Sequence, residues 1–252
     1  MAEPLLCATG LTRRFGGLVA VDQVELALHT GAVHAVIGPN GAGKSTLANL
    51  LSGELKPSSG TIRLRGEDIT GWPTDRIARH GLARTFQHTN IFAAFTAFEN
   101  CRLAVQAHAA GFPSCFRAAD RRPEWNATAR GALASAGLAG RTDVAASELS
   151  HGERRALDIA MALATGPSVL LLDEPLAGMG PEEASKIVSL LRRLAVGHAI
   201  LLIEHDMDAV FALAHHLTVM ANGRVLASGT PEAIRANAEV QEVYLGAVTP
   251  PE

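Results

Sequence analysis

The sequence lacks the features that mark secreted, membrane-spanning and disulfide-stabilised proteins. Its three cysteines, Cys7, Cys101 and Cys115, are far apart and form no CxxC or Cys/His metal pattern, so we expect reduced thiols in cytosol. No apolar run approaches the roughly 18 residues that cross a bilayer, and the first residues lack the basic and apolar segments of a signal peptide. We therefore expect any association with a membrane to go through a partner protein.

An excess of positive charge is also missing. The formal net charge is −3, which provides no global positive field for a nucleic acid or an anionic membrane surface, so we expect no nucleic-acid partner.

The length and the apolar content of the chain are sufficient for a large folded domain. Its 252 residues, 48% of them hydrophobic, can fill the core of one large α/β domain or of one domain with a smaller subdomain.

Strand and helix patterns alternate through most of the chain. The apolar patterns predict strands at residues 5–11, 19–28, 32–37, 61–64, 169–172, 199–203, 217–220 and 224–229, the last two closing around the hairpin dipeptide Asn222-Gly223. Helices are predicted at residues 44–53, 152–164, 182–194 and 206–214. The alanine-rich stretch 86–148, with helical segments at 104–110 and 127–136, is interpreted as a helical insertion. This order predicts an α/β fold with a mostly parallel sheet covered on both faces.

A glycine-rich turn lies between a predicted strand and a predicted helix. Gly38-Pro-Asn-Gly-Ala-Gly-Lys-Ser45 satisfies GxxxxGK[ST], a pattern in which backbone N–H groups surround phosphate oxygens at the N-terminus of a helix. Lys44 supplies a mobile positive charge to the outer phosphates, and the Ser45 hydroxyl can bind Mg²⁺. The turn therefore predicts binding of a nucleoside triphosphate.

Asp173 and Glu174 directly follow an apolar strand. The carboxylate of Asp173 is expected at the carboxyl edge of the sheet, beside the glycine-rich turn, where it can hold Mg²⁺ through water. Glu174 is the natural residue to orient or deprotonate the attacking water. Together with the turn, this pair predicts hydrolysis of the triphosphate.

A third motif, Leu149-Ser-His-Gly-Glu153, resembles the signature sequence of ATP-binding cassette (ABC) ATPases. The resemblance implies one P-loop NTPase domain with an N-terminal antiparallel β subdomain, a helical subdomain inserted at about residues 86–150 and a C-terminal tail at about 230–252. It also implies a head-to-tail dimer with a second ABC ATPase, a paralogue or a second copy. Ser150 and Gly152 of one subunit would contact the γ-phosphate of the ATP held by the other.

Three more residues gain roles from the same resemblance. Gln87 matches the glutamine that binds Mg²⁺ and links the core to the helical subdomain, His205 matches the histidine at the γ-phosphate, and Phe15 matches the aromatic that stacks on adenine. The implied catalytic residues are Glu174, His205, Lys44 and Gln87, and the implied Mg²⁺ ligands are Ser45, Gln87 and Asp173. The implied ATP-binding residues are Phe15, Gly38, Pro39, Asn40, Gly41, Ala42, Gly43, Lys44, Ser45, Thr46, Ser150 and Gly152.

The resemblance covers nearly the whole chain, and two further segments indicate one group within the ABC ATPases. Arg13-Arg-Phe-Gly-Gly-Leu-Val-Ala-Val and Ile203-Glu-His-Asp-Met look like the ATPase subunits of branched-chain amino-acid importers, and urea or short-amide importers have similar ATPases. Such subunits are implied to lie on the cytoplasmic face of the membrane, beside a second ATPase, two permeases and, indirectly, a periplasmic solute-binding protein. The cargo and the direction of transport are expectations from the resemblance alone.

The chain departs from the family pattern at three positions. His151 replaces the first glycine of the signature pair and Glu153 replaces its glutamine, and both are compatible with this group. Gly180 stands where many ABC ATPases carry an aspartate, or this group an asparagine, that contacts the other subunit. Coupling between the two ATP sites is therefore expected to be weaker, or the partner supplies the polar group.

Other classes of protein account for fewer of these motifs. A soluble ABC protein that acts on DNA or ribosomes usually carries two cassettes or a long coiled-coil insertion, whereas this chain has one cassette and a modest helical insertion. A P-loop kinase or GTPase leaves the signature motif and His205 unexplained, and no Asn-Lys-x-Asp motif for guanine is present. A non-catalytic binding subunit would not need Lys44, Asp173 and Glu174 together. We therefore expect an ATPase that drives import through a membrane partner.

Overall fold

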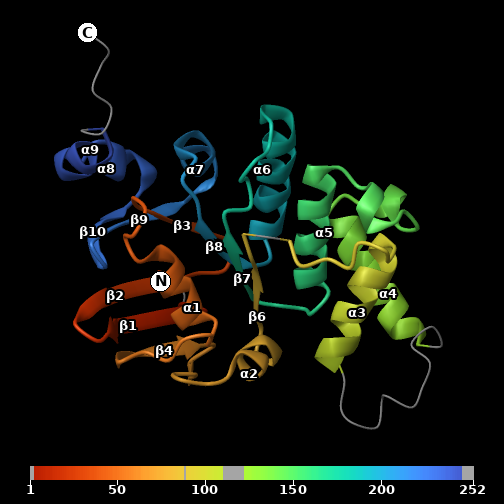
Figure 1. Cartoon of the computed structure of the whole chain (residues 1–252), viewed down its shortest axis with the longest axis horizontal. Coiled ribbons are helices and arrows are strands. Elements are labelled where there is room, and N and C mark those ends of the chain that lie inside the picture. Colours follow the sequence, from red (N-terminus) through yellow and green to blue (C-terminus); the bar gives the residue numbers. More distant parts are fainter. Residues whose placement is uncertain (1–2, 88, 110–121, 246–252) are drawn as a thin grey trace.

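The computed structural model describes residues 3–87, 89–109 and 122–245, so Cys115 lies outside the described residues. Two β-sheets form the body of the molecule, with helices packed on and beside them (Figure 1). The first sheet is antiparallel and has the order β2-β1-β4-β5. Its strands are β1 (Leu6–Phe15), β2 (Leu18–Leu28), β4 (Ser59–Leu64) and β5 (Glu67–Asp68). This sheet is the N-terminal antiparallel part that the resemblance implied.

The second sheet has six strands in the order β10-β9-β3-β8-β7-β6, and all neighbours except the β9/β10 pair are parallel. Its strands are β3 (Val33–Ile37), β6 (Leu82–Thr85), β7 (Val169–Asp173), β8 (Ala199–Ile203), β9 (His216–Ala221) and β10 (Arg224–Gly229). Asn222 and Gly223 join β9 to β10 with φ values of +49° and +79°, the conformation that the hairpin dipeptide predicted. The mostly parallel sheet is thus confirmed.

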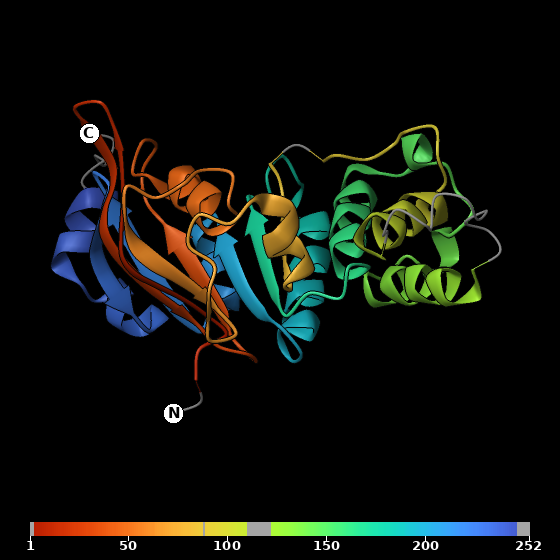
Figure 2. The same cartoon turned by 90° about the horizontal axis from the view of Figure 1, so that it is seen from below.

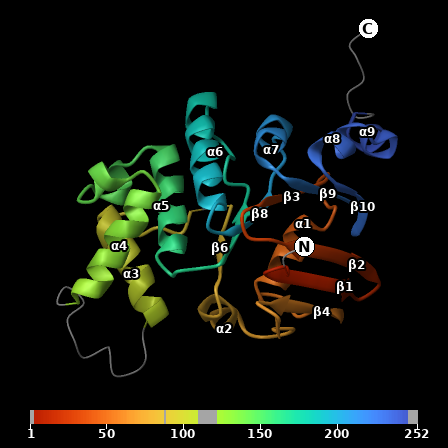
Figure 3. The same cartoon turned by 180° about the vertical axis from the view of Figure 1, so that it is seen from behind.

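Helices pack against the parallel sheet, and some of them form a cluster at one end of the molecule. The helices are α1 (Lys44–Leu51), α2 (Thr74–Arg79), α3 (Ala97–Ala109), α4 (Pro123–Ser135), α5 (His151–Leu163), α6 (Pro181–Ala195), α7 (Met207–Leu213), α8 (Pro231–Arg235) and α9 (Ala238–Leu245), with short 3₁₀ turns at Ala139–Arg141 and Ala146–Glu148. Helices α3, α4 and α5 stand together at one end of the molecule (Figure 2). Helices α8 and α9 lie at the opposite end, near β10 (Figure 3). Within the described residues, no helix combines the length and apolar character needed to cross a membrane.

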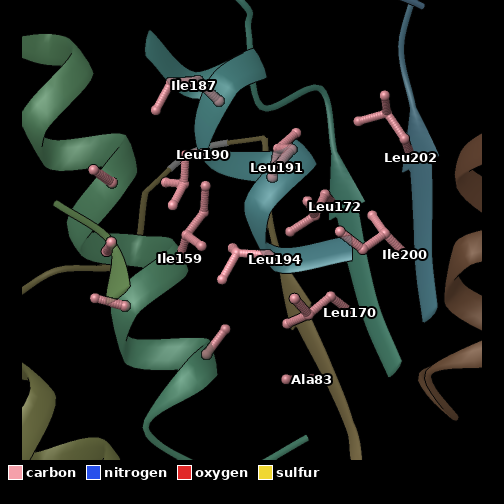
Figure 4. Close-up of a cluster of buried hydrophobic side chains, with 14 of the residues drawn as sticks. Ala83, Ile159, Leu170, Leu172, Ile187, Leu190, Leu191, Leu194, Ile200 and Leu202 are labelled. Carbon is pink, nitrogen blue, oxygen red and sulfur yellow. The ribbon is translucent and has the colours of Figure 1, made fainter. Parts of the chain in front are cut away.

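Side chains of the parallel strands alternate between two apolar cores. Leu170 and Leu172 of β7 pack with Leu190 and Leu194 of α6 on one face of the sheet (Figure 4). Leu171, from the same strand, belongs to the core on the other face, together with residues of α1, β1, β2 and β4. Both faces are covered, as predicted, but the second is covered mainly by the antiparallel sheet and α1 rather than by several helices. This layering leaves the carboxyl ends of β3, β7 and β8 at one edge.

His34 of β3 is a buried histidine in contact with both sheets. Its Nδ1 lies 3.3 Å from the carbonyl oxygen of Ala27 in β2, and its Nε2 lies 2.8 Å from Oγ1 of Thr218 in β9. Burial, followed by the nearby His216, lowers the pKa of His34 from 6.5 to about 4. The folded chain therefore keeps this imidazole neutral at pH values where an unfolded chain would protonate it.

Acid is consequently expected to destabilise the fold through His34. The stabilisation from the neutral imidazole is complete above about pH 6.5 and is lost as the pH falls toward 4, by up to ~3 kcal/mol, because the unfolded state binds the extra proton. Urea unfolding at pH 7 and at about pH 4.5, on wild type and His34→Gln, measures this loss. His34 lines an open pocket together with His29, His216, Glu25 and Cys7, and these four groups are present in both proteins. Equal pH dependence in the two proteins would remove His34 from this role.

Candidate active site

The glycine-rich turn joins β3 to α1, and neighbouring strands shape its backbone. Gly43 has a φ of +99°, and a Cβ at this position would overlap the carbonyl oxygen of Ala20 in β2, so only glycine fits. Lys44 is buried, and its Nζ donates hydrogen bonds to the carbonyl oxygens of Gly38 (2.6 Å) and Pro39 (3.0 Å). The ammonium group therefore lies within the turn, at the N-terminal end of a helix, where anions bind most readily.

An open pocket of about 500 Å³ lies beside this turn. Two apolar side chains of the pocket remain open to solvent, Phe15 (42% exposed) and Leu18 (66% exposed). An exposed aromatic ring next to the glycine-rich turn is suited to stacking on a planar base. The pocket is lined by Phe15, Leu18, Val19, Ala20, Asn40, Gly41, Ala42, Gly43, Lys44, Ser45, Thr46, Glu174, Asn222 and Gly223.

Asp173 ends β7 and pairs with a buried arginine. Its Oδ2 accepts a hydrogen bond of 2.9 Å from Nη2 of Arg84 in β6. Nη1 of Arg84 donates to Oδ1 of Asn49 (2.7 Å) and to Oγ of Ser52 (3.0 Å), in and just after α1. Arg84 thus ties the end of β7 to the helix that follows the glycine-rich turn. The sequence motifs did not indicate this residue.

Glu174 brings three of the predicted catalytic residues together. Its backbone has a φ of +47°, uncommon for a residue with a side chain, and its N–H donates to the carbonyl oxygen of Ile203 at 2.8 Å. Oε2 of Glu174 accepts a hydrogen bond of 2.8 Å from Nε2 of Gln87, and Oε1 lies 3.8 Å from Nδ1 of His205. Burial lowers the pKa of Lys44, while the negative charges of Glu174 and Asp173 oppose that shift. The carboxylates and the lysine therefore share one site.

Glu204 is a buried carboxylate that connects two loops of this site. Its Oε1 accepts the N–H of Leu176 (2.8 Å), and its Oε2 accepts the N–H of His205 (3.1 Å). Burial raises the pKa of Glu204, and the hydrogen bonds from Leu176 and His205 oppose the shift. The loop after Glu174 is thereby fixed to the loop that carries His205. Sequence reasoning missed Glu204, because a single glutamate beside a histidine gives no signal of burial.

The second group of predicted residues lies at the N-terminus of α5. Oγ of Ser150 accepts the N–H of Glu153 (3.2 Å), and Oε2 of Glu153 accepts the N–H of Ser150 (2.9 Å), which together form a capping box. The hydrogen bond from Ser150, supported by Arg141, lowers the pKa of Glu153. Glu153 therefore has a clear structural role at the position where the signature sequence usually has glutamine.

A carboxylate already contacts the donors at this helix N-terminus. Oε1 of Glu183 in α6 accepts hydrogen bonds from Oγ of Ser150 (3.3 Å) and from the N–H of Gly152 (3.1 Å). These are the two groups that the signature motif predicts for a γ-phosphate. In the single chain, Glu183 therefore stands in the place expected for that phosphate.

The remaining departures from the signature pattern also lie close to the loop between β7 and α6. Nε2 of His151 lies 3.2 Å from the carbonyl oxygen of Ala177 in that loop. Gly180 is the N-cap residue of α6, without a side chain to cap it. His151 thus links the signature motif to the loop, whereas Gly180 provides no polar group there.

The two groups of predicted residues stay apart within one chain. Ser150 and Gly152 line a cavity of about 580 Å³ together with Glu183, and among the described residues none lines both this cavity and the pocket beside Lys44. The motifs thus form one site around the glycine-rich turn and one separate group of hydrogen-bond donors at the N-terminus of α5. A ligand in the pocket of the same chain would not meet both.

Two family models match this sequence. The model described as "ABC transporter" matches residues 21–177, which is more than half of the chain. The model described as "Branched-chain amino acid ATP-binding cassette transporter" matches residues 224–248. The first match spans the glycine-rich turn, the signature motif and Asp173-Glu174, and the second begins at β10.

Individual proteins are similar over nearly their whole length. The high-affinity branched-chain amino acid transport ATP-binding protein LivG of Escherichia coli (strain K12) is 42% identical over 253 residues, covering 98% of this chain and 99% of that protein. The corresponding protein BraF of Pseudomonas aeruginosa has the same identity and coverage. A crystal structure of the ADP conformation of an ATP-binding cassette of an ABC transporter superimposes with a TM-score of 0.86 at 30% identity, covering 97% of this chain and 100% of that one.

Proposed function

This chain belongs to the ABC transporter family as an ATP-binding ATPase, and we propose that it energises an importer of branched-chain amino acids. The observation that carries the proposal is the 42% identity, over 98% of this chain, to ATP-binding proteins of high-affinity branched-chain amino acid transport. The separate match of residues 224–248 to a branched-chain amino acid transporter model supports the same cargo. In this proposal the chain hydrolyses ATP, and its partners contact the amino acid.

The pocket beside Lys44 supports a mechanism for hydrolysis. Lys44 and the N–H groups of the glycine-rich turn bind the phosphates, and Phe15 stacks on the adenine. Glu174 orients the attacking water and accepts its proton. Gln87 holds the carboxylate of Glu174 through the 2.8 Å hydrogen bond. His205, whose Nδ1 lies 3.8 Å from Oε1 of Glu174, would contact the γ-phosphate from the same site. Charge that develops on the γ-phosphate is then stabilised by groups already in place.

The same place offers oxygen donors that fit Mg²⁺. We assign the cation to the Ser45 hydroxyl, the Gln87 amide and the carboxylate of Asp173. Because Nε2 of Gln87 donates to Glu174, the amide oxygen is the atom that remains for the cation. Mg²⁺ prefers oxygen ligands and keeps several waters, which suits a site with few carboxylates. A bound Mg²⁺ would neutralise part of the negative charge of the phosphates.

The separation of the two motif groups supports a head-to-tail dimer. Ser150 and Gly152 donate toward an anion, but they line a different cavity from the pocket beside Lys44. A second ATPase subunit, a paralogue or another copy, would bring its own nucleotide to these donors and receive the same in return. ATP would then hold the dimer closed, and hydrolysis would open it.

This arrangement requires the γ-phosphate to displace Glu183, because Ser150 and Gly152 cannot serve both anions. Replacing Glu183 with glutamine removes the competing negative charge while keeping the size of the side chain. We expect the ATP concentration for half-maximal dimerisation to fall by about threefold to tenfold, since a charge-assisted hydrogen bond contributes about 1.5–3 kcal/mol before partial compensation by the amide. Analytical ultracentrifugation in a Glu174→Gln background, where hydrolysis is blocked, measures this concentration.

Glu182→Gln is the matched control for Glu183, because Glu182 is adjacent on α6 and its carboxylate pairs with Lys186 at 2.9 Å in solvent. The control is expected to dimerise at the same ATP concentration as the parent. Should Glu183→Gln require the same or a higher ATP concentration than the parent, Glu183 does not compete with the phosphate.

Residues 89–96, which precede α3, support contact with membrane permeases. Phe92 (56% exposed) and Phe95 (42% exposed) stack with ring centroids 5.5 Å apart, an unusual exposed aromatic pair. Asn100 of α3 fixes this segment, accepting the N–H of Phe92 at Oδ1 (2.8 Å) and donating from Nδ2 to the carbonyl oxygen of Phe92 (3.1 Å). We assign this segment to the transmission of dimer closure to two permeases, with a periplasmic binding protein acting through them. The chain then lies peripherally on the cytoplasmic face of the membrane.

Affinity purification of the tagged protein from gently solubilised membranes tests this proposal. We expect two permeases and a second ATPase to be recovered, and the reconstituted complex with its binding protein to take up labelled leucine, isoleucine or valine when ATP is supplied. Uptake of urea or a short amide instead would change the cargo. Recovery of ribosomes or nucleic acid, with ATPase activity entirely in the soluble fraction, would replace transport with a soluble ABC function.

A further inference from the structure

A buried arginine lies on α5, the signature helix, which begins at the signature motif. It contacts the two loops that carry Gln87 and Glu174, the proposed catalytic pair. Arg155 in α5 is 1% exposed, which is exceptional for the longest charged side chain. Its Nη1 donates to the carbonyl oxygen of Phe86 (2.7 Å), and its Nη2 donates to the carbonyl oxygens of Gln87 (2.8 Å) and Glu174 (3.3 Å). One guanidinium therefore contacts the backbone after β6 and the backbone after β7.

The geometry matches what a guanidinium does and what other side chains cannot. Its planar group presents several N–H donors in a fixed fork, so it can bind the consecutive carbonyls of Phe86 and Gln87 and still reach Glu174. The side chains of Gln87 and Glu174 then meet each other at 2.8 Å on the side of the nucleotide pocket. Arg155 thus holds the backbone carbonyls of Gln87 and Glu174, the two residues whose side chains form the proposed catalytic pair.

Burial of this charge is costly and is only partly offset by an ion pair. The nearest carboxylate oxygen, Oδ2 of Asp158 on the next turn of α5, lies 3.7 Å from Nη1, beyond hydrogen-bond distance. Burial lowers the pKa of Arg155, and burial also raises the pKa of Asp158 to about 7. The three hydrogen bonds to backbone carbonyls are therefore the main compensation for burying this charge, and they tie the position of the guanidinium to that of both loops.

We propose that Arg155 is a positioning residue that aligns Gln87 with Glu174 and makes their alignment depend on the orientation of the signature helix. The proposal rests on the catalytic roles proposed above for Glu174 and Gln87. Because Ser150 and Gly152 begin the same helix, a tilt of α5 when they bind a phosphate moves the guanidinium and, through it, both catalytic loops. Each subunit's own hydrolytic site therefore responds to the nucleotide of its partner. Arg155 would thus couple the two ATP sites in a chain where Gly180 has no polar side chain to contact the other subunit.

Arg155→Met and Arg155→Lys test the proposal in the full-length protein. Methionine removes the fork while filling the space, and Asp158 can become protonated when its partner is lost. We expect kcat for ATP hydrolysis to fall by about 10–100-fold in Arg155→Met with KM for ATP within about threefold, because misplacement of reacting groups costs rate rather than binding. Lysine, which can reach fewer carbonyls, is expected to lose about threefold to tenfold. Arg154→Met, next to it on α5, is the matched control and keeps the wild-type rate.

Hydrogen–deuterium exchange separates positioning from a general loss of stability. In Arg155→Met, amides in peptides covering residues 82–87 and 172–177 are expected to exchange faster than in wild type, while the strands β3 and β8 keep their protection. Faster exchange throughout the chain, or a loss of ATP affinity as large as the loss of kcat, would show a structural role only. A wild-type kcat in both Arg155 variants would overturn the proposal. These readouts use the isolated ATPase, so failure to recover permeases would refute the transport function without affecting the role of Arg155.

Discussion

Glu174→Gln is expected to bind ATP with nearly wild-type affinity and to hydrolyse it about 10²–10⁴-fold more slowly, because a positioned general base contributes a factor of this size. Glutamine keeps the length of the side chain, and its amide oxygen can still accept the 2.8 Å hydrogen bond from Nε2 of Gln87. What it loses is the negative charge that orients water and takes its proton. Release of phosphate under saturating Mg·ATP gives the rate, and titration with a fluorescent ATP analogue gives the affinity.

The same variant is expected to accumulate as a dimer. If hydrolysis opens the dimer, a subunit that binds ATP without cleaving it stays closed, and size-exclusion chromatography with Mg·ATP should show the larger species. Glu182→Gln is again the matched control, since Glu182 is exposed in α6 and faces Lys186 rather than the pocket. Turnover in Glu174→Gln within about tenfold of wild type would exclude Glu174 as the general base.

The parts of the fold that sequence patterns predicted best are those with one simple cause. Strand β8 was predicted at residues 199–203 and is found there, because its five residues are all apolar and all buried in the sheet. Helix α1 begins at Lys44, where the glycine-rich turn ends. Helix α3, by contrast, begins at Ala97 rather than near residue 104. Thr96 and Glu99 start it with a local hydrogen-bonded cap, a signal that the alanine-rich pattern concealed.

Short elements that depend on distant partners were not predicted. Helix α2 has six residues and buries only Ile77, too little for a helical period to appear. Strand β6 contains Arg84, whose side chain would be interpreted as solvent-exposed without knowledge of Asp173 at 2.9 Å. Such segments are set by tertiary contacts, which override local propensity.

The same limit applies to the candidate site. The glycine-rich turn, Asp173, Glu174 and the signature motif are contiguous patterns, and the structure places Gln87 and His205 near different oxygens of the Glu174 carboxylate. Arg84, Glu204 and Glu183 are single charged residues, and their importance comes from a partner elsewhere in the chain. Nothing in their immediate sequence distinguishes them from surface charges. Only a structure, which shows burial and contacts, can find residues of this kind.

Lys44→Ala is expected to have the other large effect, on binding as well as on hydrolysis. The buried ammonium group of Lys44 lies inside the glycine-rich turn and near the carboxylates of Glu174 and Asp173. Without it, two carboxylates face the phosphates with less compensating charge, and the turn loses the donor that holds the carbonyls of Gly38 and Pro39. Loss of a charge-assisted contact to phosphate is expected to weaken ATP binding by about 10–100-fold, and kcat/KM by about 10³-fold or more.

Calorimetric titration with ATP and steady-state phosphate release measure the two effects of Lys44→Ala separately. Lys56→Ala is the control, because Lys56 is exposed in the loop before β4 and its backbone carbonyl, which the substitution keeps, accepts a hydrogen bond from Arg13. In Lys44→Ala, the affinity for ATP should fall more than the affinity for ADP, since Lys44 acts on the outermost phosphate. An equal loss of affinity for ADP and ATP would place Lys44 at the inner phosphates, and an unchanged affinity for both would show that its hydrogen bonds serve only to hold the turn. Since Glu174→Gln removes the rate and keeps the binding whereas Lys44→Ala removes both, the pair separates a residue that performs chemistry from one that holds the nucleotide for it.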